Sequence, residues 1–143
     1  MKHLRHLSLW FDRFVLLVAT LIFALIGSRY IADPVGAAAT SDISLGSALA
    51  ISTMRVGFGA FPLGCALVAV TCLLSPNRLR TGLSFVAVIF GVALAVRVFA
   101  ILGDGTLRAS LSLLSAEALL VTLSIVGLVV DIGQKRQGSR EAM

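Results

Sequence analysis

The stretch RTGLSFVAVIFGVALAVRVFAIL, residues 80–102, decides the fold class of this chain. Between Arg80 and Arg97 it contains no charged residue, and it is long enough to cross the roughly 30 Å hydrocarbon core of a bilayer, which takes about 20 helical residues. Further spans are predicted for three other apolar stretches, at 11–31, 49–74 and 110–130. The sequence therefore predicts an all-α integral membrane four-helix bundle, formed as a single transmembrane domain over residues 1–143.

The composition of the chain agrees with a membrane setting. Of its 143 residues 58% are hydrophobic and only 13% are charged, and the mean hydropathy is +1.01. In a soluble protein the net charge of +5 would favour a nucleic-acid partner, but here the basic residues lie mostly at the ends of the apolar stretches. This placement is typical of membrane topology signals, and we expect no nucleic-acid partner.

The basic residues also predict the orientation of the spans. Three Lys and Arg residues lie in the N-terminal segment, two in the loop between the second and third spans, and three in the polar tail 132–143. Only four lie on or toward the opposite side, so the positive-inside rule places both termini and the tail in the cytoplasm. Because no A-x-A cleavage site directly follows the segment IGSRY at 26–30, we expect a retained span rather than a signal peptide.

Four ionisable residues lie within the predicted spans near their non-cytoplasmic ends. Counting depth at 1.5 Å per residue places Arg29 and Arg97 roughly 6 Å inside the boundary. The same count places Glu117 about 9 Å inside and Arg55 at the boundary itself. Arginine stays charged in proteins and needs water or a counter-charge, so we predict that Arg97 pairs with Glu117, the only acid at this depth within a span.

This charged layer, Arg29, Arg55, Arg97 and Glu117, has two interpretations. It is a structural ion-pair network that fixes the register of the helices, or it is a binding site. Three arginines against one glutamate leave positive charge for an anionic lipid head group or another ligand, and ionisable residues inside membranes are often functional. The residues alone favour neither interpretation.

Small and polar residues predict which helix faces meet. A polar stripe with seven-residue spacing on the fourth helix belongs inside a bundle: Ser110, Glu117, Ser124 and Asp131. Small residues let membrane helices approach closely, so we expect helix packing at Gly57, Gly59, Gly64, Ala87, Gly91 and Ala95. The last three form one stripe that faces another helix of the bundle or a second subunit. Pro62 predicts a disturbed helix in the second span, because it frees the carbonyl of Phe58.

No pattern in the sequence indicates catalysis. Cys65 and Cys72 lie two helical turns apart, too far to bridge, and are expected to be buried apolar residues. His3 and His6 have no third metal ligand. There is no nucleophile–base pair, no H-E-x-x-H motif and no carboxylate pair at one depth, so we expect no enzymatic activity, no metal and no cofactor.

Three short motifs link the chain to a family. An arginine opens the second span before glycines in MRVGFGAFPLG, another arginine precedes an Asp-Gly turn in VRVFAILGDG, and a glutamate falls early in the fourth span in SAEALL. In these features the chain resembles the small bacterial proteins grouped as domain of unknown function 4345. The resemblance covers about residues 10–130 and implies a four-helix protein of the bacterial inner membrane, without implying an activity.

Two classes of function follow from these observations. The first is a non-enzymatic membrane protein that binds lipid or acts as an accessory subunit of a larger membrane complex, with membrane lipid and a membrane protein or a second copy as partners. The alternative is a small transporter or channel in which Glu117 exchanges protons or cations. Neighbouring arginines would hold Glu117 ionised, which makes it a poor proton carrier.

Overall fold

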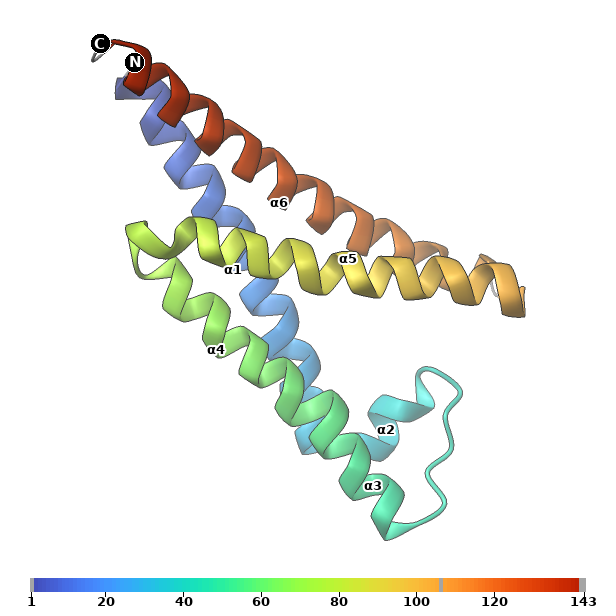
Figure 1. The fold of residues 1–143 in the computed structure, drawn as a ribbon. Helices are drawn as coiled ribbons and strands as arrows, with labels where there is room; N and C mark the ends of the chain where they lie inside the picture. Colours follow the sequence, from blue (N-terminus) through green and yellow to red (C-terminus); the bar gives the residue numbers. More distant parts are fainter. Residues whose placement is uncertain (1, 106, 142–143) are drawn as a thin grey trace. The chain divides into compact units, whose positions relative to one another are not determined.

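The computed structural model describes residues 2–105 and 107–141, and over these residues it is built from helices joined by short connections (Figure 1). The first half of the chain contains α1 (Lys2–Ala32), α2 (Pro34–Ala39), α3 (Ala48–Met54), the π-helix η1 (Arg55–Ala60) and α4 (Phe61–Leu73). The second half contains the 3₁₀ turn η2 (Pro76–Arg78), α5 (Leu79–Asp104) and α6 (Leu107–Glu141).

Four helical segments of the described chain are long and apolar enough to cross a membrane: Leu7–Ala32, Ala48–Leu73, Pro76–Asp104 and Ser110–Asp131. Large apolar side chains on them are turned outward, with Leu102 81% and Phe99 78% exposed, as expected where acyl chains replace water. The prediction of an all-α chain with four long apolar helices is confirmed, and this arrangement is consistent with a four-span membrane bundle.

The helix α6 extends well past the fourth predicted span. The span was predicted to end near residue 130, but the backbone stays helical to Glu141. Residues 132–141 contain no proline, so every residue of this stretch keeps the backbone N–H that continues the helix where the chain becomes polar. Apart from Gly133, the side chains of the predicted tail and residues 142–143 lie outside the described residues.

The chain forms two compact units. The first unit combines the N-terminal segment through Leu16 with everything from Cys72 onward, and the second unit is Leu17–Thr71. The long helix α1 contributes to both units. The first unit therefore contains the start of α1 with α5 and α6, and the second contains the rest of α1 with α2, α3, η1 and most of α4.

In the first unit, α5 and α6 form an antiparallel hairpin (Figure 1). The turn after α5 needs a left-handed residue, and Gly105 supplies it with φ 67° while its N–H donates to the carbonyl of Ile101 at 3.1 Å. The start of α1 packs on the hairpin through Leu16, which is fully buried, and through Asp12, whose Oδ1 lies close to Gly127 of α6. The buried side chains of this unit include Leu83, Val86 and Ser124.

In the second unit, the end of α1 packs against η1 and α4 through glycines. A Cβ built at Gly27 would lie 2.8 Å from the carbonyl oxygen of Gly59 and 3.0 Å from the nitrogen of Leu63, so this approach is backbone to backbone. A Cβ at Gly59 would lie 2.7 Å from Cγ1 of Ile31. Beside this contact the rings of Tyr30 and Phe58 lie 5.3 Å apart. Small residues thus provide the close approach that membrane helices need.

The disturbance predicted at Pro62 takes the form of a widened helical turn just before it. The N–H of Phe61 donates to the carbonyl of Val56, five residues back, and residues Arg55–Ala60 are π-helical. Proline has no N–H to continue the usual ladder, and its ring crowds the carbonyl four residues earlier. Widening the turn moves that carbonyl away and keeps the segment helical.

Candidate functional site

The charged pair of the first unit is Arg97 of α5 with Glu117 of α6. The Nε of Arg97 donates to Oε2 of Glu117 at 2.7 Å, and Nη2 donates to Oε1 at 2.6 Å. Two parallel, charge-assisted bonds of this kind fix the relative orientation of guanidinium and carboxylate. The ion pair predicted from the sequence is therefore present, in a two-pronged geometry that depth counting alone does not reveal.

Helix geometry explains why these two residues meet. The turn at Gly105 lies between them in the sequence, so they come from opposite arms of the α5–α6 hairpin. Side chains in a helix tilt toward its N-terminus, so Arg97 leans away from the turn while Glu117 leans toward it. At 1.5 Å per residue Glu117 starts several ångström farther from the turn than Arg97, and these opposite tilts close the difference.

The pair sits at the edge of the helix contact rather than deep inside it. The side chain of Arg97 is 27% exposed and that of Glu117 12% exposed. A lone arginine at the centre of a membrane helix costs about 2.5–3.5 kcal/mol on insertion scales, and a bidentate partner reduces this cost. Glu117 therefore neutralises Arg97 in place, and the pair does not depend on water to compensate its charges.

The other two arginines of the charged layer, Arg29 and Arg55, belong to the second unit. Arg29 lies in the last turn of α1, where a cation is favoured by the helix dipole, and Arg55 is the first residue of η1. Both side chains are exposed. Neither arginine forms an ion pair with an acidic side chain among the residues that the structure describes. Their convergence with Arg97 and Glu117 into one layer stays a prediction, since Arg97 and Glu117 belong to the first unit.

The predicted packing residues divide into two groups. Gly59 stands at the close contact with Ile31, whereas a Cβ at Gly57, Gly64 or Gly91 would meet nothing within 4 Å. In the remaining stripe positions Ala87 is half-buried and Ala95 is exposed. A packing role for Gly57, Gly64 and the Ala87–Gly91–Ala95 stripe thus stays a prediction. Three glycines that spacing along the sequence did not indicate stand at close contacts between helices: Gly27, Gly82 and Gly127.

The polar stripe of α6 faces the interior of the first unit along much of its length. Glu117 meets Arg97, and Ser124 is fully buried. Asp131 lines a cavity together with Asp12 of α1. The expectation that no two carboxylates share one depth is therefore wrong. It failed because depth was counted from Arg13, which placed Asp12 outside the span and hid its proximity to the end of the stripe.

The described residues offer no set of three His, Cys, Asp or Glu side chains that would hold a metal ion. Cys65 and Cys72 are free and buried, as predicted for apolar packing residues.

The family model described as Domain of unknown function (DUF4345) matches residues 11–128. The chain belongs to this family. The DUF4345 match includes Arg29, Arg55, Arg97 and Glu117, and it also includes Asp12, while Asp131 lies just beyond its end. Comparison with the curated proteins and with the solved structures gives no match. With its four long apolar helices the chain is a multi-pass membrane protein of the DUF4345 family.

Proposed function

We propose that this protein binds the anionic head group of a membrane lipid through Arg29 and Arg55, without catalysing a reaction. The observation that supports this role is the distribution of charge among the arginines. Arg97 is neutralised by Glu117 at 2.6 Å, whereas the exposed Arg29 and Arg55 have no ion-pair partner among the described residues. The second unit therefore carries two guanidinium groups that a phosphate can satisfy with two-pronged hydrogen bonds.

The surroundings of these arginines are suited to a lipid interface. Arg29 and Arg55 lie on two segments that pack together through Gly27 and Gly59, so their backbones are held at a fixed separation. The neighbouring rings of Tyr30 and Phe58 contact each other. Aromatic side chains beside arginine at the end of a span are typical of the membrane–water interface.

We further propose that both termini lie in the cytoplasm of a bacterium and that the protein resides in its inner membrane. The distribution of Lys and Arg between the loops supports this orientation. Arg29 and Arg55 then contact the outer leaflet, where lipid phosphates meet the ends of the first and second spans.

The experiment that tests lipid binding compares arginine variants by native mass spectrometry. The full chain is purified in mild detergent with added phosphatidylglycerol or phosphatidylcholine, and the retained lipid is measured. One interfacial arginine contributes about 1 kcal/mol to binding an anionic lipid surface, or roughly a fivefold change. We expect Arg29→Gln and Arg55→Gln each to lower phosphatidylglycerol retention by about this factor.

The matched control is Arg78→Gln, which removes an exposed arginine from η2 in the first unit. Its retention of phosphatidylglycerol should equal that of the unmodified chain. Equal losses in all three variants would mean that any interfacial arginine attracts the lipid, and the proposed site would then be rejected. Equal retention of the two lipids would reject it as well.

The transporter alternative has less support. A carboxylate that carries protons or cations must release its partner during each cycle, and Glu117 is held by two bonds from Arg97. Flux into proteoliposomes that disappears in Glu117→Gln would reverse this ranking.

An accessory role in a larger complex is the remaining part of the proposal. The open space beside Gly91 supports it, because a helix of another chain could approach there closely. Cross-linking in native membranes tests for such a partner or for a second copy, and a monomer that cross-links to nothing would remove this part.

A further inference from the structure

The ion pair of the first unit leaves one edge of the Arg97 guanidinium free. A guanidinium has five N–H groups, and Glu117 accepts one from Nε and one from Nη2. The second N–H of Nη2 and both N–H groups of Nη1 remain, and these three donors are termed the free edge of Arg97. Nη1 has no hydrogen-bond partner among the described residues and, unlike the buried Nε of Arg13, is not shut off from the molecular surface.

The helix faces around the pair offer the free edge no side-chain acceptor. One helical turn from Arg97 on α5 lie only apolar residues, namely Ala93, Leu94, Ala100 and Ile101. The residues one turn from Glu117 on α6 are three leucines and Val121. An N–H donor without an acceptor away from water is unfavourable, so the free edge calls for an acceptor from outside the described chain.

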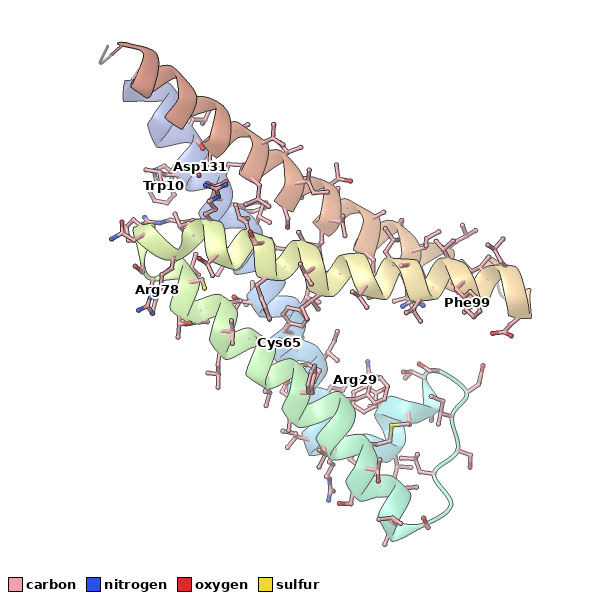
Figure 2. All side chains as sticks on the ribbon, in the orientation of Figure 1. Trp10, Arg29, Cys65, Arg78, Phe99 and Asp131 are labelled. Carbon is pink, nitrogen blue, oxygen red and sulfur yellow. The ribbon has the colours of Figure 1, made fainter. Side chains whose placement is uncertain are left out.

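The position of the free edge favours an acceptor from the bilayer over water. Arg97 lies eight residues before the Gly105 turn, about 12 Å along α5, and its side chain tilts farther from the turn to reach Glu117. Figure 2 shows Phe99 on this part of α5, far from Arg78 in η2. Interfacial arginines usually extend toward the membrane surface, whereas the pairing with Glu117 draws this guanidinium inward.

The charges near the pair favour an uncharged ligand. Arg97 and Glu117 cancel each other, so an anion would bring an uncompensated charge into apolar surroundings. The exposed Asp104 lies seven residues, or about 10 Å, from Arg97 along α5. Arg108, whose side chain is outside the described residues, lies nine residues, or about 13 Å, from Glu117 along α6. Neither residue is close enough along its helix to contact the pair.

We propose that the free edge of Arg97 binds the carbonyl oxygen of an uncharged molecule dissolved in the bilayer. A carbonyl oxygen accepts hydrogen bonds without adding charge, and the apolar residues around the pair suit a hydrocarbon body. Two kinds of membrane molecule carry this group, the acyl esters of phospholipids and the quinones. They share one acceptor chemistry, and the two arms of the test separate them.

The first arm measures carbonyl hydrogen bonding by infrared spectroscopy. The full chain is reconstituted in nanodiscs of diether phosphatidylcholine, whose ether-linked chains have no carbonyl groups. Decylubiquinone with isotope-labelled carbonyls is then added in increasing amounts. A carbonyl that accepts a hydrogen bond has a lower stretching frequency, so we expect a saturable population of quinone at the lower frequency.

The second arm replaces the diether lipid with ester-linked phosphatidylcholine whose carbonyls are labelled. If the quinone is the ligand, its saturable population persists in the ester lipid. If the acyl ester is the ligand, the ester carbonyls show a lowered frequency that depends on Arg97, and the quinone is displaced. Either result supports the carbonyl site and identifies the source of the ligand.

Variants assign the signal to the free edge. Arg97→Lys keeps a charge that can pair with Glu117, but an ammonium group lacks the second edge of a guanidinium, so we expect about tenfold weaker binding. Arg78→Lys makes the same exchange in η2 and should leave binding unchanged. If Arg97→Lys does not fold, as judged by circular dichroism, the charge-neutral Arg97→Gln/Glu117→Gln variant is measured in its place, with the same weakening expected.

Two results would overturn the proposal. One is the lack, in both arms, of a lowered carbonyl frequency that depends on Arg97, and the other is equal weakening in Arg78→Lys. Phosphatidylcholine has no net charge, so this test does not rely on binding of phosphatidylglycerol by Arg29 and Arg55. Failure of the carbonyl site and failure of the anionic lipid site are therefore distinguished.

Discussion

Arg97 and Glu117 illustrate how much a pair of charges inside a span depends on mutual geometry. Each residue alone would be unfavourable there, and Glu117 is only 12% exposed. Arg97 compensates this carboxylate from the neighbouring helix at a distance of 2.6 Å. Removing one partner from such a pair is more destabilising than removing both, because the remaining charge is left without compensation. The pair is therefore best tested by a double-variant cycle.

We predict that Glu117→Gln lowers the free energy of unfolding by about 2 kcal/mol, since Arg97 loses a charge-assisted partner. The double variant Arg97→Gln/Glu117→Gln should recover part of this loss. Stability is measured by chemical unfolding in lipid–detergent micelles, with Asp104→Asn as control. If the loss in the double variant equalled the sum of the losses in Glu117→Gln and in Arg97→Gln, the ion pair would not contribute as a unit.

Gly127 is a second position where one atom decides the packing. A Cβ added there would lie 2.6 Å from Oδ1 of Asp12 and 2.9 Å from Cδ1 of Leu83, so both side chains must move. We predict that Gly127→Ala destabilises the chain by about 1–2 kcal/mol, the usual range for overpacking. In Gly91→Ala the new methyl meets nothing within 4 Å, and the same unfolding measurement should show no loss.

Among the helical elements, η1 departs most clearly from regular geometry. Its first residue is Arg55, and the π-helical turn before Pro62 sets the direction in which that arginine leaves the helix. A return to ordinary α-helix would rotate the preceding turn about the helix axis, because an α-turn contains fewer residues than a π-turn. The orientation of Arg55 thus depends on a residue seven positions away.

We therefore predict that Pro62→Ala allows η1 to shift toward α-helical pairing and that Arg55 changes direction. Amide hydrogen exchange over residues 55–63 should slow as regular hydrogen bonds form. In the lipid assay, phosphatidylglycerol retention should fall about as far as in Arg55→Gln, roughly fivefold. Unchanged exchange in Pro62→Ala would show that the proline does not hold the π-helical turn open.

Hydropathy was sufficient to locate the four long helices, because about 20 consecutive apolar residues have few stable alternatives to a membrane helix. Counting residues inward from the ends of the spans was sufficient to pair Arg97 with Glu117. The π-helical turn was only partly foreseen, since Pro62 indicates a disturbance but not the form that it takes. Gly27 and Gly127 were missed because their partners, Gly59 and Asp12, belong to other helices, and spacing along one helix does not identify such contacts.

At the scale of the whole molecule, the proposed orientation places both termini in the cytoplasm, and it can be tested by labelling. In a Cys65→Ala/Cys72→Ala background, a single cysteine is introduced at the exposed position Ser44 or Asn77. We predict that a membrane-impermeant maleimide labels Ser44→Cys in intact cells and labels Asn77→Cys only after the cells are opened. The reverse pattern would show that the protein is inserted the other way round.

The turn at Gly105 has a consequence for how the protein is made. It joins α5 directly to α6, so Glu117 leaves the ribosome only 20 residues after Arg97. The two helices can therefore enter the bilayer together as a prefolded hairpin in which the opposite charges already cancel. During biogenesis Arg97 then need never meet lipid tails as an isolated cation, and a longer loop in place of this turn would delay that cancellation.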